Sequence, residues 1–241
     1  MVSSTTDVRE QVQPFLLSVV IPVYNEKPTL QTLIESVLEA PYDKQIILVD
    51  DGSTDGSRQI VQAHEGRDGF DVVLQPENRG KGAALRAGFR LVKGDAVIIQ
   101  DADLEYDPGD YPLLIEIIRK GNADVVYGSR YQSNQAMLPW TKYRLGVMIL
   151  NLLVKLLYFR HITNEATCYK AFRASVLKAI PLRCRRFEFC SEVTAKCIRR
   201  GYPIIEVPIS FRFRTVEAGK KIRMRDGFEA AWALLKFRFV N

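Results

Sequence analysis

Histidine and cysteine, the residues that most often build zinc and redox sites, are scarce in this sequence. There are two histidines in 241 residues. The four cysteines (Cys168, Cys184, Cys190 and Cys197) lack the paired spacing of a zinc site. The sequence therefore predicts reduced, structural thiols of the kind found in cytosolic proteins.

Long apolar runs are also missing. The longest apolar stretch, Leu145–Phe159, is interrupted by Asn151 and Lys155. It is shorter than the ~20 apolar residues that a membrane span needs. The basic residues that flank it favour a helix lying in a membrane interface, and a buried core or dimer helix is an equally good interpretation. These flanking residues are Lys142, Arg144, Arg160 and His161.

Two common phosphate-binding signatures are absent. No G-x-G-x-x-G motif follows the first apolar run, which excludes the usual dinucleotide fingerprint. The segment NRGKGAA lacks the G-x-x-x-x-G-K-[ST] spacing of a phosphate-binding loop. A nucleotide site in this chain must therefore be built in another way.

What the sequence does contain is an acid cluster that follows a buried strand, within Gly94–Pro108. Residues two apart on an extended chain project to one side, so Asp101 and Asp103 can face one ion, and Glu105 follows on the loop. Such oxygen ligands suit Mg²⁺ or Mn²⁺, which usually share their coordination with substrate phosphates. The alternative is a solvated acidic loop that caps the next helix. The position after a strand favours a ligand site, because open α/β sheets bind ligands there.

The first half of the chain alternates strands and helices. Apolar runs predict strands at 16–24, 45–49, 71–74, 96–99 and 123–127. Helices are predicted between them. The first covers 28–39, the second runs from an N-cap at 53–55 to 63, the third has Leu85, Phe89 and Val92 on one face, and the fourth covers 112–120. This rhythm predicts an α/β fold with a doubly wound, mostly parallel sheet and helices on both faces. Acids and glycines recur at the strand ends, which favours a nucleotide-type site.

The second half is less regular. We expect a strand at 167–172, a helix at 187–200, and short edge strands at 204–207 and 209–213 broken by Pro208. A basic loop around Gly219 is expected to be mobile, before a terminal helix at 227–240. In that helix the spacing of Phe228, Trp232, Leu235 and Phe239 is more typical of core packing than of lipid contact.

Charge is divided unequally along the chain. Residues 1–120 hold 12 Lys/Arg against 20 Asp/Glu, whereas residues 121–241 hold 22 against 8. The basic half indicates a polyanionic partner such as anionic lipid, a phosphorylated ligand or nucleic acid. A non-enzymatic nucleic-acid-binding protein is the weakest of these interpretations, because no helix-turn-helix or stacking-aromatic pattern is present. The acids at the strand ends would also repel a phosphate backbone.

Several motifs together resemble family 2 glycosyltransferases, and within them the dolichyl-phosphate (polyprenyl-phosphate) mannose and glucose synthases. The resemblance runs from Leu16 to the C-terminus and rests on VVIPVYNE, ILVDDGSTDGS, NRGKGAALRAGF, DADLEYDP, GSRY, FRASVL, GYPIIEVPISF and RTVEAGKK. It implies a GT-A fold over 15–241 after a flexible tail at 1–14, with a nucleotide-sugar-binding half (15–130) and an acceptor- and membrane-facing half (131–241). It also implies a basic, amphipathic C-terminal helical part.

The resemblance also implies site residues. Asp103 and Glu105 would hold Mg²⁺ or Mn²⁺, and Arg130 and Arg144 would hold the acceptor phosphate. The catalytic residues would be Asp101, Asp103, Arg130 and Arg214. The nucleotide sugar would contact Pro22, Tyr24, Glu26, Val49, Asp51, Lys81, Asp101, Ala102, Asp103, Arg214 and Lys220, the last two within a mobile lid.

The implied reaction is an inverting, metal-dependent transfer of a hexose from a GDP-mannose or UDP-glucose type donor to polyprenyl phosphate. The alternative is a family 2 enzyme with a soluble or polysaccharide acceptor. No signal peptide or confident transmembrane helix is visible, so we expect peripheral attachment to the cytoplasmic side of an anionic membrane, through the chain itself, a membrane-anchoring partner protein or a homo-oligomer. Nucleic acid is not expected as a partner.

The chain departs from the family pattern in the segment NEATCYK. Asn164 and Cys168 stand where many relatives carry an acid and a glycine. Since Asn cannot act as a base, either Glu165 takes the part of that acid or the acid is structural in the relatives.

Overall fold

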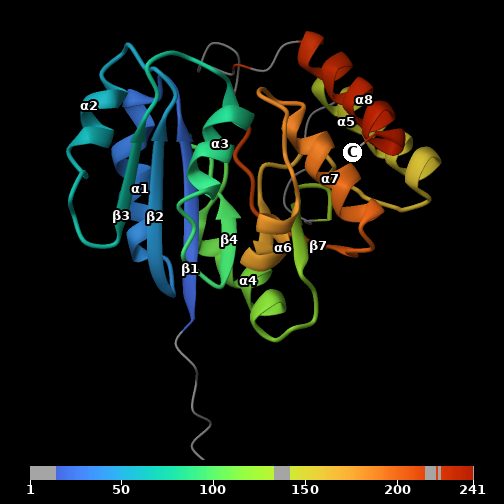
Figure 1. The fold of residues 1–241 in the computed structure, drawn as a ribbon, viewed down its shortest axis with the longest axis horizontal. Coiled ribbons are helices and arrows are strands. Elements are labelled where there is room, and N and C mark those ends of the chain that lie inside the picture. The colour runs from blue at the N-terminus through green and yellow to red at the C-terminus, as the bar shows by residue number, and fades with distance from the viewer. Residues whose placement is uncertain (1–14, 133–141, 215–220, 222–223, 241) are drawn as a thin grey trace, which may run out of the picture.

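The computed structural model describes residues 15–132, 142–214, 221 and 224–240 (Figure 1). Seven strands form one sheet in the order β3-β2-β1-β4-β6-β5-β7. Their bounds are β1 Leu16–Val23, β2 Asp43–Asp50, β3 Phe70–Leu74, β4 Ala96–Ile99, β5 Val125–Ser129, β6 Lys170–Arg173 and β7 Ile204–Pro208. The two halves of the chain therefore share a single sheet.

All neighbouring strands are parallel except at β6, which runs antiparallel to both β4 and β5. This arrangement confirms the predicted α/β class and mostly parallel sheet. It also brings the carboxyl ends of β1, β2, β4 and β5 to the same edge of the sheet, where open α/β sheets bind ligands. β7 lies at the sheet edge, as its proline predicted.

Helices cover both faces of the sheet. One face packs against α1 (Lys27–Glu39), α2 (Ser57–Gln62) and α4 (Tyr111–Arg119), the last preceded by a 3₁₀ turn at Pro108–Asp110. The other face packs against α3 (Lys81–Phe89), α6 (Ala174–Ala179) and α7 (Phe189–Arg199). In α1, Leu30, Leu33, Ile34 and Val37 recur at helical spacing and are fully buried, so this helix is held by an apolar stripe.

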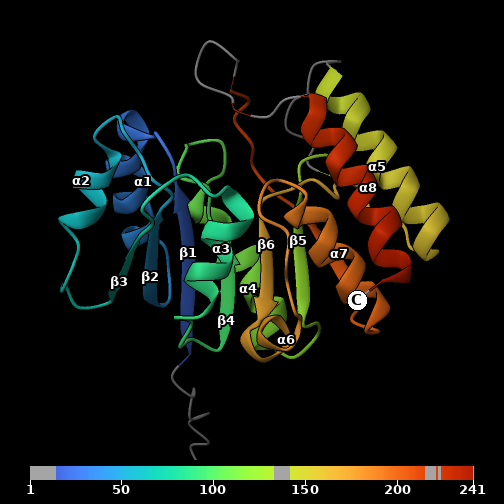
Figure 2. The ribbon, with the colours of Figure 1, turned by 45° about the horizontal axis from the view of Figure 1, so that its top comes forward.

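A further layer covers α7. The helices α5 (Lys142–Tyr158) and α8 (Met224–Phe239) lie side by side on it (Figure 2). Their inner faces share a core of Leu150, Val154, Tyr158, Ala230, Ala233, Leu234 and Phe237. Both helices also carry exposed apolar side chains on the faces turned away from this core.

The prediction that the aromatic stripe of α8 packs in the core is wrong. Phe228, Trp232, Leu235 and Phe239 are exposed, Trp232 at 64%. The buried face of α8 is formed instead by Ala230, Ala233, Leu234 and Phe237, which pack against α5 and α7. The inner face of α5 is part of the core, as one of the two interpretations predicted. Leu152 on its outer face is 53% exposed, and contact of that face with a membrane stays a prediction.

Several predicted boundaries are also corrected. The helix expected from 53–55 begins at Ser57, and the Asp55 carboxylate accepts the Ser57 amide at 2.9 Å. α3 ends at Phe89, so Val92 is buried outside it. The expected strand at 209–213 is not regular structure, and the short helix α6 was not predicted. Segments of four to six residues carry too little periodicity to predict reliably.

Candidate active site at the carboxyl edge of the sheet

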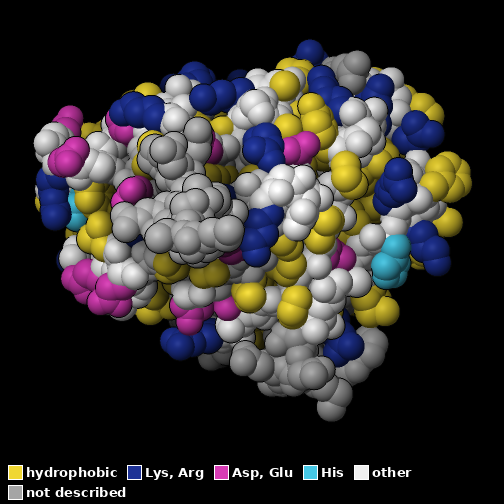
Figure 3. All heavy atoms as spheres, turned by 90° about the horizontal axis from the view of Figure 1, so that it is seen from below, with side chains coloured by type: hydrophobic (Ala, Val, Ile, Leu, Met, Phe, Trp, Pro, Cys, Tyr) yellow, Lys and Arg dark blue, Asp and Glu magenta, His cyan; other side chains and the backbone are white. Residues whose placement is uncertain are grey.

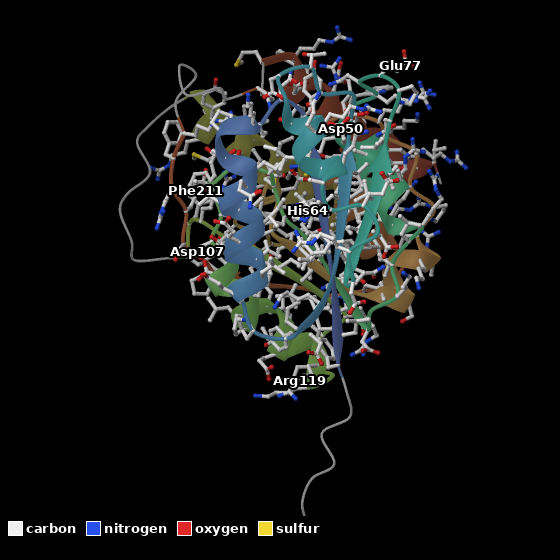
Figure 4. The ribbon with its side chains drawn as sticks, turned by 90° about the vertical axis from the view of Figure 1, so that its left-hand side faces the viewer. Asp50, His64, Glu77, Asp107, Arg119 and Phe211 are labelled. Atoms are coloured by element: carbon white, nitrogen blue, oxygen red, sulfur yellow. The ribbon has the colours of Figure 1, made fainter. Side chains whose placement is uncertain are left out.

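The acids after β4 lie against two other segments of the chain. The Thr29 hydroxyl of α1 donates to the Ala102 carbonyl at 3.0 Å. The segment after β7 crosses the same loop, where the Arg212 amide donates to the Glu105 carbonyl at 2.9 Å. Figure 4 shows Phe211 and Asp107 on one side of α1, consistent with the edge-on contact between the rings of Phe211 and Tyr106. Three remote segments therefore meet around the acid cluster.

Two cations from the segment after β7 pair with acids at this edge of the sheet. The Arg214 guanidinium donates to both oxygens of Glu26 at 2.8 and 3.3 Å and stands 3.6 Å from an Asp103 carboxylate oxygen. The Lys221 ammonium donates to Glu26 at 2.6 Å and to the Tyr24 carbonyl. The Arg214 amide also donates to the Glu105 carboxylate at 2.9 Å. The cations after β7 thus close over the acids from outside.

Asp103 is the electrostatic focus of the site. Burial, followed by the charges of Asp101, Glu105 and Glu26, raises the pKa of Asp103 to about 7. In the part of the chain that the structure describes, no three His, Cys, Asp or Glu side chains converge as a complete metal cage. Mg²⁺ and Mn²⁺ commonly take one or two carboxylates and complete their coordination with water and phosphate. The crowded, oxygen-only donors Asp103 and Glu105 fit that chemistry.

Asp101 is paired from the opposite side. The Lys81 ammonium, at the start of α3, forms an ion pair with its carboxylate and lies 2.9 Å from the Cys168 sulfur. Both charged side chains are largely buried, at 12% and 16% exposed. Asp101 and Lys81 are thus brought together as the sequence predicted for one site, and their roles in binding stay predictions.

Asp51 organises the glycine-rich turn before α3. Its carboxylate accepts the amides of Arg79 and Gly80 at 2.9 and 2.8 Å, and burial raises its pKa. A Cβ on Gly80 or Gly82 would approach the backbone oxygens of Arg185 and Cys184 to 2.5 and 2.7 Å. Glycine is required at both positions because the loop before α7 packs too closely to leave room for a side chain. The predicted contact of Asp51 with a base stays a prediction.

Arg130 follows β5 and points toward the same edge. Its guanidinium donates to the Asn164 side-chain oxygen at 2.9 Å and lies over the Phe211 ring, 4.7 Å from its centroid. Its Nε is buried and has no hydrogen-bond partner among the described residues. Arg144 is half-buried in the first turn of α5, and its pairing with Arg130 across a shared phosphate stays a prediction.

The remaining predicted residues divide into three groups. Pro22 and Tyr24 are half-buried at the end of β1. Val49 and Ala102 are buried, at 0% and 4% exposed, so their side chains belong to the core in this structure. Lys220 lies outside the described residues.

Sequence reasoning missed two contacts and the burial of a third residue. Lys221, next to the predicted Lys220, is the lysine that pairs with Glu26. Asn164, noted only as a departure from the family, bonds Arg130. Glu165, the proposed substitute base, is fully buried, and burial raises its pKa, so it cannot reach a substrate without rearrangement. Lys221 is the last residue of the RTVEAGKK motif, so the sequence carried a signal for it, whereas the other two depend on tertiary packing.

A cavity lies away from this edge of the sheet. It has a volume of about 480 Å³ and lies between α8 and the loop before α7. Its lining is rich in cations and includes Arg183, Arg185, Arg186, Lys236 and Trp232. We do not take it as the site of chemistry, because the acids and their paired cations are at the sheet edge.

The chain belongs to glycosyl transferase family 2, whose sequence profile matches residues 18–180. It is 35% identical over 226 residues to undecaprenyl-phosphate 4-deoxy-4-formamido-L-arabinose transferase of Edwardsiella ictaluri, covering 91% of this chain and 64% of that protein. It is 29% identical to dolichol-phosphate mannosyltransferase of Pyrococcus furiosus, covering 88% of this chain and 61% of the relative. The low-salt glycan biosynthesis hexosyltransferase Agl6 of Haloferax volcanii is also 29% identical, with 93% and 53% covered. The chain thus spans between about half and two thirds of these relatives.

Solved structures confirm the predicted GT-A type of α/β fold. Glucosyl-3-phosphoglycerate synthase from Mycobacterium tuberculosis, in complex with Mn²⁺, UDP and phosphoglyceric acid, superposes with a TM-score of 0.72. The match covers 94% of this chain and 80% of that one, at 19% identity. The same enzyme with Mg²⁺ and UDP gives a TM-score of 0.67 at 20% identity, over 94% and 80% of the two chains. At this identity the likeness concerns the fold.

Proposed function

We propose that this chain transfers a hexose, with inversion, from a nucleotide-diphosphate sugar to a polyprenyl phosphate at a membrane surface. The observation that carries the transferase proposal is the meeting of Glu26, Asp103 and Glu105 with Arg214 at the carboxyl edge of a family 2 sheet. The relatives named for undecaprenyl-phosphate and dolichol-phosphate chemistry support the acceptor. The donor is of the GDP-mannose or UDP-glucose type.

Donor binding rearranges existing ion pairs. Asp103 and Glu105 would hold Mg²⁺ or Mn²⁺, which supplies positive charge to the diphosphate when bound. Arg214 and Lys221, now engaged by Glu26, are within reach of the same loop and can turn to the diphosphate. Negative charge grows on the nucleotide as the glycosidic bond breaks, so cations placed there stabilise the transition state more than the bound donor.

The acceptor needs orientation more than activation. A lipid phosphate is ionised at neutral pH, so its oxygen can attack the anomeric carbon from the face opposite the departing nucleotide without losing a proton to the protein. Arg130 is suited to hold this phosphate, because its guanidinium is fixed by Asn164 and Phe211 and retains a buried Nε–H without a described partner. Catalysis would then consist of positioning and electrostatic stabilisation.

The outer face of α5 and α8 supports a membrane as the location. We define this outer face as Leu145, Met148, Ile149, Leu152, Leu156 and Phe159 with Phe228, Trp232, Leu235 and Phe239, all exposed. Contiguous exposed apolar surface of this kind usually meets a partner or a membrane. Figure 3 shows acidic side chains mainly on the left, the side of α2 and β3, while basic and hydrophobic side chains intermingle on the right. No helix in the described ranges is long and apolar enough to cross a bilayer.

The experiment that tests the proposal is a donor and acceptor panel. Purified protein with Mg²⁺ or Mn²⁺ is incubated with UDP- and GDP-sugars, with and without polyprenyl phosphate in liposomes, and nucleotide release and sugar-lipid product are measured. We expect one donor to react only when the lipid phosphate and the metal are both present. Transfer to a soluble phosphorylated acceptor would contradict the proposal that polyprenyl phosphate is the acceptor. Absence of turnover with every donor would overturn the transferase proposal.

A further inference from the structure

Two cysteines from separate elements meet beside the candidate site. Cys168 lies just before β6, and Cys190 lies in the first turn of α7. The Cys190 sulfur lies 3.8 Å from the carbonyl oxygen of Thr167, the residue before Cys168. Each thiol also shifts the pKa of the other. Both cysteines are only half-buried. Spacing along the chain gave no sign of this pair, because the two residues are 22 positions apart.

The Cys168 side chain contacts the acids after β4 through Lys81. The Cys168 sulfur is 2.9 Å from the Lys81 ammonium, which forms the ion pair with Asp101. The Cys168 amide donates to the Tyr106 hydroxyl at 3.1 Å, and the Tyr106 ring contacts Phe211. A change at the Cys168 sulfur therefore acts directly on a cation of the candidate donor site.

The two thiols differ in character. The hydrogen bond from Cys168, with the nearby charges of Lys170 and Lys81, lowers the pKa of Cys190 against the effect of burial. A position in the first turn of a helix also favours a thiolate. The same hydrogen bond, with burial, raises the pKa of Cys168. A thiolate-prone cysteine with a protonated neighbour is the usual arrangement of an attacking and a resolving thiol.

The other two cysteines lack these features. Burial raises the pKa of Cys197 to about 12, and burial with the charge of Glu192 raises the pKa of Cys184. Both are expected to stay protonated and slow to oxidise. They serve as internal controls for the reactive pair.

We propose that Cys168 and Cys190 form a redox-sensitive dithiol whose oxidation to an intramolecular disulfide impairs the adjoining donor site. With a peroxide as the oxidant, the Cys190 thiolate attacks the peroxide oxygen and becomes a sulfenic acid. The hydroxide or alkoxide that is expelled takes up a proton from the solvent and leaves as water or an alcohol. The Cys168 thiol then attacks that sulfur, the S–S bond forms, and a second water leaves. In sum, two thiols are oxidised by two electrons and one peroxide is reduced.

The disulfide changes what Lys81 contacts. In the dithiol the Cys168 sulfur sits beside the ammonium and shares it with Asp101. In the disulfide that sulfur is drawn toward α7 and no longer carries a proton or a charge, so Lys81 loses one of its two partners. The effect on turnover rests on the proposed function, whereas formation of the disulfide does not.

The test treats the reduced full chain with hydrogen peroxide at a low molar excess. Intact mass spectrometry is expected to show the loss of two hydrogens, and peptide mapping a Cys168–Cys190 cross-link that dithiothreitol removes. Sugar transfer is expected to fall in parallel and to return on reduction, with a change in donor KM that reflects the loss of a positioning contact. Cys190→Ser is expected to retain transfer and to resist the oxidant, while Cys184→Ser is expected to behave as wild type.

Other outcomes overturn the proposal. A cross-link that involves Cys184 or Cys197 would show that Cys168 and Cys190 are not a redox-sensitive dithiol. Oxidation of Cys190 to sulfinic acid without a cross-link would show the same. If the Cys168–Cys190 cross-link forms but donor KM and turnover stay unchanged, the disulfide does not affect the donor site. If the reduced chain transfers no sugar at all, the proposed function fails, and peptide mapping still decides whether the disulfide forms. Should Cys190→Ser fail to fold, wild-type mapping with the Cys184→Ser control carries the same decision.

Discussion

The acid-lined edge of the sheet and the outer face of α5 and α8 differ in whether their side chains have partners within the chain. At the sheet edge, Glu26, Asp101 and Asp103 each have a cation from the chain itself within 4 Å. On the outer face, Phe159 and Phe228 are 81% and 73% exposed. The first region is closed upon itself, while the second faces outward with its apolar side chains in solvent.

The difference indicates what each region would bind: a charged ligand at the sheet edge, and an apolar partner or lipid on the outer face. In the proposed function, ion pairs at the edge would hold the cations until a diphosphate competes for them, so the site would be assembled before the ligand arrives. Full burial of a large apolar side chain provides roughly 1.5–3 kcal/mol, and each partly exposed side chain on the outer face leaves a share of that free energy unrealised. That stabilisation becomes available only when a partner or lipid covers the face. The following predictions test this contrast.

The largest effect is expected at Asp103. Asp103→Asn should reduce transfer by at least about 10³-fold, because a metal stabilises the leaving diphosphate by several kcal/mol. The melting temperature should stay the same or rise, since one of several mutually repelling carboxylates is removed. Activity and thermal unfolding are measured together.

Asp43→Asn is the matched control, because Asp43 is an exposed acid at the opposite end of β2. It should leave both quantities unchanged. Full activity of Asp103→Asn in EDTA would show that the acids are an ordinary charged loop.

Arg130→Ala should lower turnover about 10²-fold, in line with the loss of one charged donor to a reacting phosphate. Arg130→Lys should recover only part of it, because lysine cannot provide a planar fork while bonding Asn164. The measurement is kcat and acceptor KM at saturating donor. Arg90→Ala is the control, because Arg90 is an exposed cation at the C-terminal end of α3. An unaltered acceptor KM and kcat in Arg130→Ala would remove this residue from the acceptor site.

Arg214→Ala and Lys221→Ala should each reduce kcat by about 10-fold, and at least as much as donor affinity, since closure matters most when charge develops on the leaving group. The double variant tests whether they act as one unit. Because both cations pair with Glu26, we expect the combined loss to be less than the product of the single losses. Variants that change only thermal stability would make this segment structural.

On the outer face, Trp232→Glu and Leu152→Glu should weaken co-sedimentation with anionic liposomes by about 10-fold each and leave the fold intact, because both side chains are exposed. Val154→Glu, on the buried face of α5, should unfold the protein. Circular dichroism separates the two results. Wild-type protein that ignores liposomes would show that another partner covers this face.

The smallest effect is expected from the cations around that face. Lys155→Ala or Lys236→Ala should reduce liposome binding by about 1 kcal/mol, and the reduction should disappear at high salt or on neutral lipid. Both residues are exposed on α5 and α8, so folding should be unaffected. Equal losses on neutral vesicles would indicate packing of the lysine stems instead of charge.

The sequence by itself determined the α/β class, the buried parallel strands and the placement of acids at strand ends. These features are local, since a run such as Ala96–Ile99 is apolar enough to be buried on both faces and the acids directly follow it. The order of the motifs was sufficient to predict the family, which the profile match over residues 18–180 confirms. The roles of the individual site residues stay predictions.

Only the tertiary structure decided the contacts that join distant segments. The spacing of Phe228, Trp232, Leu235 and Phe239 describes a helix face equally well whether it points inward or outward, and the packing of Ala230 and Ala233 turned it outward. The antiparallel β6, the pairing of Lys221 with Glu26 and the meeting of Cys168 with Cys190 likewise have no local signature. Periodicity reports which residues share a face, and only the packing of the whole chain decides what that face meets.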